Sequence, residues 1–303
     1  MTPIYQGIIP PMITPLTGRD TLDVAGLERL VERMIAGGVH GIFALGTSGE
    51  APSLSLRLRR EVVERTCQAV AGRVPVLVGI TDTSLVESAS LAQFASEQGA
   101  AAAVTSAPFY FPAGQSELRE YIEQLLPELP LPLMLYNMPS MTKVSFGAET
   151  VSWALDQPAI IGLKDSSGDL VYFRRMQYLA AECRPDWSLL VGPEELLAEV
   201  VLLGGHGGIN GGANVHPQLY VGLYNAARCG DLARVRELSA QVMAFSSAIY
   251  SIGHYGSAII KGLKCSLSVL GICDDFMAAP FHHFNAAERQ LVEQRLQQLK
   301  ITS

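Results

Sequence analysis

The stretch AIIGLKDSSGD, residues 159–169, places one lysine inside an apolar run. Two isoleucines, a glycine and a leucine precede Lys164, and a segment of small and acidic residues follows it. A short continuous run of aliphatic residues that ends at such a segment is typical of a buried parallel strand. The run therefore predicts a strand over 160–165, with Lys164 near its carboxyl end.

Seven further runs of the same kind occur along the chain. They lie at 7–13, 41–46, 75–80, 101–107, 131–137, 188–192 and 204–210. The intervening stretches repeat apolar residues at three- and four-residue spacing, which indicates amphipathic helices. The clearest of these stretches are 23–38, 55–72, 84–99 and 118–129.

Eight buried strands that alternate with helices predict an α/β fold, the (β/α)8 TIM barrel. A doubly wound open sheet is the alternative, but no GxGxxG motif follows the first strand. From about residue 215 the pattern becomes helical to the end. We therefore expect a barrel that carries the active site over residues 1–225 and a C-terminal helical domain over residues 226–303.

Composition excludes several classes of function. The 303 residues are 49% hydrophobic with a net charge of −7, and no basic cluster favours a nucleic-acid partner. No apolar run approaches the roughly 18 residues of a membrane span, and the N-terminus lacks the pattern of a signal peptide. Five cysteines without a CxxC pair argue against a structural metal or a disulfide framework. We expect a cytoplasmic protein without a metal or other cofactor.

The lysine at 164 has three interpretations. It pairs with a carboxylate, for which Asp165 and Asp169 are candidates, or it extends its amine into solvent. Alternatively it is a nucleophile, because burial favours the neutral amine and a neutral amine attacks carbonyl groups to form a Schiff base. The chain has five lysines, and two others, Lys261 and Lys264, are predicted to lie on a solvated helix face.

Two other strand ends offer partners for this lysine. Tyr136 ends the strand before it, and neighbouring strands lie about 4.8 Å apart, so the phenol is a candidate proton shuttle or an aromatic plug at the barrel mouth. The turn GTSGEAPSLS, residues 46–55, presents Thr47, Ser48 and backbone N–H groups. Such a turn is able to bind a carboxylate, although it is also common as a plain turn or helix cap.

Five motifs in order resemble the dihydrodipicolinate synthase / N-acetylneuraminate lyase family over nearly the whole chain. They are GTSGE (46–50), SAPFYFP (106–112), YNMPSMT (136–142), GLKDSSGD (162–169) and GGINGGANVHP (207–217). The resemblance implies a TIM barrel with a helical extension and a homotetramer built as a dimer of dimers. It also implies a class I aldolase or lyase that binds pyruvate or another 2-keto acid as an imine.

Matching positions imply a role for each site residue. Lys164 corresponds to the imine-forming lysine and Tyr136 to the acid–base group. Thr47 and Ser48 match the positions that hold the keto-acid carboxylate, and Thr47 also hydrogen-bonds the tyrosine. Tyr110 resembles the aromatic that, in the synthases, reaches into the neighbouring subunit's site.

Three further residues complete the implied site. Ile209 is expected to place its backbone carbonyl near the imine. Glu194, with Glu195, matches an acidic pair that holds sugar hydroxyls in the lyases, although carboxylates also favour a helix start. Ser166 is a candidate for orienting the lysine or for contacting substrate hydroxyls, and it is equally able to bond backbone.

One residue departs from the family's motif and disfavours one of its activities. Met141 stands where the synthases carry an arginine for the second substrate's carboxylate, which disfavours 4-hydroxy-tetrahydrodipicolinate synthase activity. The leading prediction is a carbon–carbon lyase or aldolase that acts on pyruvate or a 2-keto-3-deoxy acid and an aldehyde. A 2-keto-3-deoxy sugar acid dehydratase and a non-enzymatic keto-acid sensor remain alternatives, and the Tyr136–Lys164 pair argues against the sensor.

Overall fold

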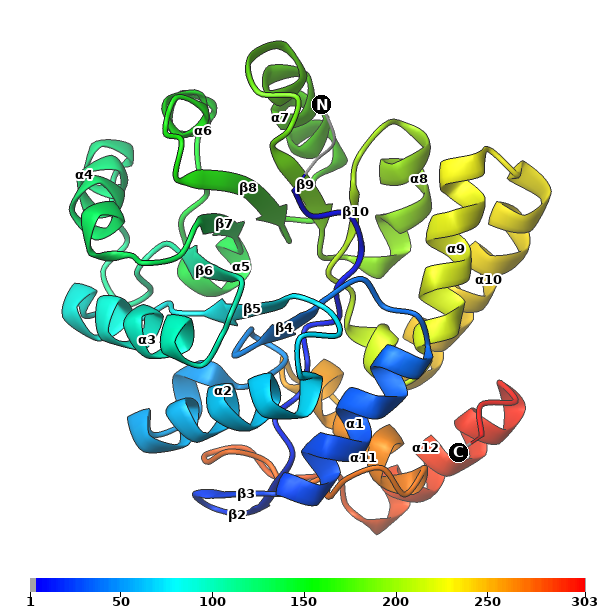
Figure 1. Ribbon diagram of the computed structural model, residues 1–303. Coiled ribbons are helices and arrows are strands. Elements are labelled where there is room, and N and C mark those ends of the chain that lie inside the picture. Colours follow the sequence, from blue (N-terminus) through cyan, green and yellow to red (C-terminus); the bar gives the residue numbers. More distant parts are fainter. Residues whose placement is uncertain (1–3, 303) are drawn as a thin grey trace.

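The computed structural model describes residues 4–302, and eight parallel strands stand at its centre (Figure 1). In the order in which they pair, they are β1 (Gly7–Ile8), β10 (Gly207–Gly208), β9 (Ser188–Val191), β8 (Ile160–Asp165), β7 (Leu133–Asn137), β6 (Ala102–Ser106), β5 (Val76–Gly79) and β4 (Ile42–Ala44). All pairings are parallel. Each strand lies inside the run that predicted it.

The sheet closes on itself just after β1. Pro11 forms a parallel bridge with Phe43 of β4. The Met12 N–H donates to the Phe43 carbonyl and the Phe43 N–H donates to the Pro10 carbonyl, both at 2.9 Å. The predicted TIM barrel is therefore confirmed.

Helices surround the strands (Figure 1). Those that follow barrel strands are α1 (Val24–Ala36), α2 (Leu56–Val70), α3 (Leu85–Glu97), α4 (Gln115–Leu125), α5 (Pro139–Thr142), α6 (Ala148–Leu155), α7 (Leu170–Cys183), α8 (Leu197–Leu202) and α9 (Pro217–Cys229). Short 3-10 helices are η1 (Ala51–Ser53), η2 (Leu126–Glu128), η3 (Glu194–Leu196) and η4 (Gly211–Asn214). Side-chain caps start several of the long helices, as where Asp169 accepts from the Tyr172 N–H.

A small antiparallel hairpin precedes α1 and was not predicted. It pairs β2 (Leu16–Gly18) with β3 (Thr21–Leu22). Strands of two and three residues are too short to leave an alternating pattern in the sequence.

The core has two parts, one on each side of the barrel wall. Inside the barrel lies a compact apolar cluster that includes Phe43, Met134, Leu190 and Ile209. A larger cluster fills the space between the strands and the surrounding helices. Because both faces of every strand are buried, the strands read as continuous apolar runs rather than alternating ones.

Three helices extend the barrel at its C-terminal side: α10 (Leu232–Ile249), α11 (Ala258–Val269) and α12 (Ala286–Gln298). The predicted boundary at residue 225 falls within α9, which continues to Cys229. The division into two domains stays a prediction. Among the described residues, no helix combines the length and apolar character needed to cross a bilayer.

The prediction for Lys264 was wrong. Its side chain is 0% exposed and forms an ion pair with Glu50, which lies just after β4. Helix α11 packs against the barrel, so the face that carries Lys264 is covered by protein rather than by solvent.

Candidate active site

The carboxyl ends of β7 and β8 bring Tyr136 and Lys164 together. The two residues are paired in the register of adjacent strands, as the strand assignment predicted. The lysine is only 3% exposed, and its Nζ lies 3.8 Å from the centre of the Tyr136 ring and 5.0 Å from the centre of the Phe43 ring. The amine is thus held between two aromatic rings at the top of the barrel interior.

The proposed carboxylate partners of this amine are engaged elsewhere. Asp165 accepts hydrogen bonds from the Asn137 side chain at 2.8 Å and from the Ser167 N–H and hydroxyl. Asp169 caps α7. Within residues 4–302, no carboxylate lies within ion-pair distance of Lys164. The ion-pair interpretation is therefore wrong, and low exposure also contradicts a solvated amine.

Burial sets the electrostatics of the pair. Loss of water lowers the pKa of the Lys164 amine, and the Tyr136 oxygen opposes this only in part. Burial acts to raise the pKa of the Tyr136 phenol, but the adjacent lysine charge and its hydrogen bonds bring the pKa below its ordinary value. A buried amine with a lowered pKa has more of the neutral, nucleophilic form at a given pH than an exposed lysine.

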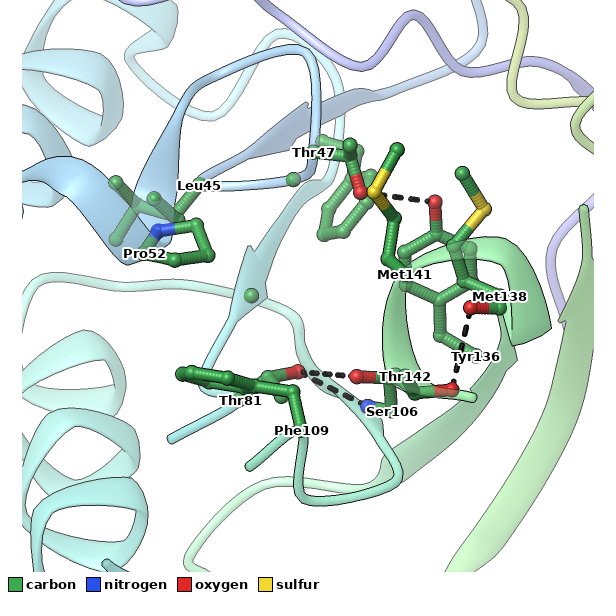
Figure 2. A pocket seen from close by; sticks show the side chains of 14 residues that line it. Leu45, Thr47, Pro52, Thr81, Ser106, Phe109, Tyr136, Met138, Met141 and Thr142 are labelled. Carbon is green, nitrogen blue, oxygen red and sulfur yellow. Dashed lines mark hydrogen bonds between the residues drawn. The ribbon is translucent and has the colours of Figure 1, made fainter. Parts of the chain in front are cut away.

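A loop after β4 supplies the next group of the site. The hydroxyls of Thr47 and Tyr136 share a hydrogen bond of 3.1 Å (Figure 2). The Gly49 N–H donates to the Gly46 carbonyl at 3.1 Å and closes the turn. The loop thereby connects directly to the tyrosine, as the implied role of Thr47 requires.

Two cavities open beside these residues. The larger, about 260 Å³, contains Lys164 and the predicted residues Ser48, Ser166, Glu194 and Ile209. The second, about 240 Å³, shares Tyr136 with the first and is mostly apolar (Figure 2). Four residues line both cavities: Thr47, Tyr136, Met138 and Met141.

Glu194 lies in the cavity wall but is fully engaged in the fold. It is 4% exposed and accepts from the Tyr220 hydroxyl at 2.5 Å, the Tyr250 hydroxyl at 3.0 Å and the Gly212 N–H at 2.8 Å. Burial raises the pKa of this carboxyl to about 7 in spite of these bonds. Glu195, the next residue, is exposed and also lines the cavity.

The structure places one predicted residue apart from the others. Tyr110 is 77% exposed and packs edge-on against the exposed Phe111, whereas Phe109 lines the apolar cavity. Within a single chain, the Tyr110 ring does not line either of the two cavities that contain Tyr136.

Sequence reasoning missed the contribution of the helical extension. Tyr250, Gly256, Ile259 and Ile260 all line the larger cavity. Nothing in the local sequence marks them, because the contact arises only when the start of α11 packs over the barrel mouth. Among residues 4–302, no three His, Cys, Asp or Glu side chains cluster as metal ligands would.

Comparisons with known proteins agree with this geometry. Residues 4–299 match the model of the dihydrodipicolinate synthetase family. The chain belongs to this family. A probable 2-dehydro-3-deoxy-D-pentonate aldolase from Escherichia coli, YjhH, is 34% identical over 269 residues, which is 88% of each chain.

Solved structures of the family superpose closely. A dihydrodipicolinate synthase from Bacteroides thetaiotaomicron is 54% identical with a TM-score of 0.95, covering 98% of this chain and 100% of its own. YagE of Escherichia coli, solved in complex with pyruvate, is 30% identical with a TM-score of 0.93, covering 98% and 99%. The predicted family is confirmed, and the chain is a class I, lysine-dependent lyase or aldolase.

Proposed function

We propose that this enzyme joins or cleaves a carbon–carbon bond between pyruvate and an uncharged aldehyde through an imine on Lys164. The observation that carries the proposal is the register of Tyr136 with Lys164. It sets beside a phenol a buried amine that has no carboxylate partner among residues 4–302. A structural lysine in such a place requires a counter-charge. A nucleophilic lysine requires a proton-transfer group, and Tyr136 is in place to serve.

The imine forms in two steps. The neutral Lys164 amine attacks the keto carbon to give a carbinolamine, and loss of the hydroxyl as water leaves the protonated imine. Tyr136 gives and takes the protons of these steps, and its hydrogen bond with Thr47 keeps the phenol oriented. Thr47 and Ser48 hold the keto-acid carboxylate, and the Ile209 carbonyl faces the imine nitrogen.

Carbon–carbon cleavage uses the imine as an electron sink. When the substrate is a 2-keto-3-deoxy acid, its C4 hydroxyl loses a proton, the C3–C4 bond breaks, and the bond electrons pass into the protonated imine. The products are an aldehyde and an enamine on Lys164. Protonation of the enamine at C3 and hydrolysis then release pyruvate, and condensation is the same sequence in reverse.

The charge of the two cavities favours an uncharged aldehyde. Among their lining residues, Lys164 is the single cationic side chain, while the exposed carboxylate of Glu195 adds negative charge. The thioethers of Met138 and Met141 lie near the hydroxyls of Thr47 and Tyr136 (Figure 2). On entering the cavity, the carboxylate or phosphate group of an anionic aldehyde would therefore lose its hydration and find no cationic side chain to replace it. This argument also disfavours the synthase reaction.

Two substrate contacts follow from burial. Because Glu194 accepts three hydrogen bonds from its own chain, we assign it to shaping the cavity wall. The exposed carboxylate of Glu195 is available to contact hydroxyls of a sugar-derived aldehyde, and the Ser166 hydroxyl, which also bonds Tyr136, lines the same cavity. A dehydratase would use the same imine, so product analysis separates it from the lyase.

We also propose that the enzyme is a cytoplasmic homotetramer in which Tyr110 acts across a subunit interface. Its exposed ring, next to the exposed Phe111, needs a partner surface. Equilibrium sedimentation of the protein and of Tyr110→Ser tests this assembly. A variant that keeps the wild-type mass and activity would contradict it.

Borohydride reduction in the presence of pyruvate tests the imine. The proposal predicts a stable adduct in the intact-mass spectrum, and no adduct without pyruvate. A panel of 2-keto-3-deoxy acids whose cleavage would give uncharged aldehydes, assayed for pyruvate release, then distinguishes cleavage from dehydration. Absence of any adduct at saturating pyruvate would exclude the imine mechanism.

A further inference from the structure

The loop that carries Thr47 and Ser48 holds an unfavourable backbone conformation. Leu45, before these residues, has φ +58°, and Glu50, after them, has φ +56°. Both values lie in the left-handed region, which residues with a side chain beyond glycine rarely adopt. Such a conformation persists only when surrounding contacts fix it, and it occurs preferentially at functional sites.

Contacts from two directions fix this loop. On the barrel side, the Thr14 hydroxyl donates to the Gly49 carbonyl at 2.7 Å. Within the loop, the Glu50 N–H donates to the Thr47 carbonyl at 3.0 Å. On the other side, the Glu50 carboxylate turns away from the cavity and accepts from the Ala278 N–H at 2.9 Å.

The strongest of these contacts is a buried ion pair with the helical extension. Glu50 pairs with Lys264 of α11, and both side chains are almost completely buried. The Lys264 amine also donates to the Phe276 carbonyl at 2.7 Å. The loop and the segment around residues 276–278 are therefore held to one another through two charged groups.

The same helix reaches the active site. Ile259 and Ile260, about one turn before Lys264, line the cavity that contains Lys164. Helix α11 thus contacts the substrate cavity with its first turn and anchors the Thr47–Ser48 loop with its next.

Stability alone does not account for an ion pair in this position. Removing two charges from water costs free energy that their attraction often fails to recover, and apolar replacements are frequently neutral or better. A buried pair is better explained where it selects one conformation among several. Here the conformation selected is a strained loop whose residues bind substrate in the proposed function.

We propose that Glu50 and Lys264 are positioning residues that fix Thr47 and Ser48 for the keto-acid carboxylate. The inference rests on the proposed function, because it assigns carboxylate binding to these two residues. It gives the helical extension a specific task, which is to hold the carboxylate site from outside the barrel.

The test is the dependence of borohydride trapping on pyruvate concentration. The double variant Glu50→Gln/Lys264→Met removes both charges together and so avoids leaving one of them buried alone. We expect its half-saturating pyruvate concentration to rise about tenfold, which corresponds to the loss of roughly one hydrogen bond to a charged group. Trapping at saturating pyruvate should be unchanged, because Lys164 and Tyr136 are untouched.

Leu267→Ala is the matched control. Leu267 is fully buried on the same helix, so its truncation loosens α11 without cutting the contact to Glu50. Its half-saturating concentration should stay at the wild-type value. Glu50→Gln alone is a second variant of nearly the same shape. Because it leaves the buried Lys264 amine without its carboxylate, we expect the same rise in half-saturation with a larger loss of stability than in the double variant.

The outcomes are distinct. Lack of an adduct in the unsubstituted protein would overturn the proposed function and this inference with it. An adduct with wild-type half-saturation in the folded double variant would overturn the positioning role alone. An equal rise in Leu267→Ala, or failure of both Glu50 variants to fold where Leu267→Ala folds, would assign the pair to general stability and also overturn it.

Discussion

Lys164 and Lys264 are both buried, yet their surroundings differ. Lys164 is the next-to-last residue of β8, with its amine above the Tyr136 ring and no carboxylate partner within the described residues. Lys264 lies on α11, paired with Glu50 and bonded to the Phe276 carbonyl. Burial lowers the pKa of both amines, and the group that opposes the shift is the Tyr136 phenol at Lys164 and the Glu50 carboxylate at Lys264.

The difference shows that burial alone does not make a lysine a nucleophile. A carboxylate beside a buried amine stabilises the protonated form of the amine and holds it in an ion pair. An amine that is buried with a phenol and two aromatic rings is able to exist neutral and to exchange protons. The neighbouring oxygen, rather than the depth of burial, separates the two roles.

The largest expected effect comes from removing the amine at Lys164. Lys164→Met should abolish the pyruvate adduct and reduce carbon–carbon cleavage by roughly 10⁴-fold or more, as for other covalent nucleophiles. The fold should remain intact, because no ion pair is broken. Steady-state pyruvate release measures the loss of cleavage, and circular dichroism checks that the fold is intact. Turnover near the wild-type rate would contradict the assignment of Lys164 as the nucleophile.

The phenol beside Lys164 should matter almost as much. Tyr136→Phe removes the proton-transfer group while it keeps the ring above the amine, so turnover should fall about 10²- to 10⁴-fold. The adduct should still form, but slowly. Borohydride trapping at a series of times measures the rate of adduct formation, and steady-state pyruvate release measures turnover. Equal turnover rates in the variant and the wild type would exclude the shuttle.

The opposite behaviour is expected at Lys264. Lys264→Met leaves the Glu50 carboxylate buried without a counter-charge and should lower the free energy of unfolding by about 3–5 kcal/mol. Urea denaturation measures this loss. The control is Lys261→Met, because Lys261 lies on the same helix and forms no ion pair with any described residue. A loss no larger than in the control would mean that the pair is not held as described.

A smaller, pH-dependent effect is expected at Glu194. Its carboxyl gives up a proton near 4.5 in the unfolded chain and near 7 in the folded one. Between these values the folded state binds more protons, so the free energy of unfolding falls as pH rises, by up to about 3 kcal/mol. Glu194→Gln should remove this slope and the exposed Glu195→Gln should keep it, which denaturation at several pH values measures.

Much of the barrel, and the pairing of Tyr136 with Lys164, can be predicted from the sequence. Eight apolar runs located the strands, and the position of Tyr136 and Lys164 near two strand ends placed them at one barrel mouth. Parallel register then brings them together without further information. The roles of the site residues, those of Lys164 and Tyr136 included, remain predictions. Of the other predicted residues, Thr47, Ser48, Ser166, Glu194 and Ile209 line the cavity that contains Lys164, and Tyr110 does not.

What the sequence did not reveal depends on contacts between distant segments. Lys261 and Lys264 are three residues apart, as on a solvated helix face, and only the packing of α11 shows that Lys264 meets Glu50. Glu194 matched a substrate-binding position, but its three hydrogen bonds come from residues that lie from 18 to 56 positions away. The sequence pattern around a residue does not predict hydrogen-bond partners so far away along the chain.

The central claim is that the imine forms on Lys164 and on no other lysine. Peptide mapping of the protein after reduction with borohydride and pyruvate tests this directly, because the chain has only five lysines. We predict that the modified residue is Lys164, and that Lys164→Met yields no modified peptide. An adduct on Lys264 or on any other lysine, or one that survives in Lys164→Met, would contradict the account.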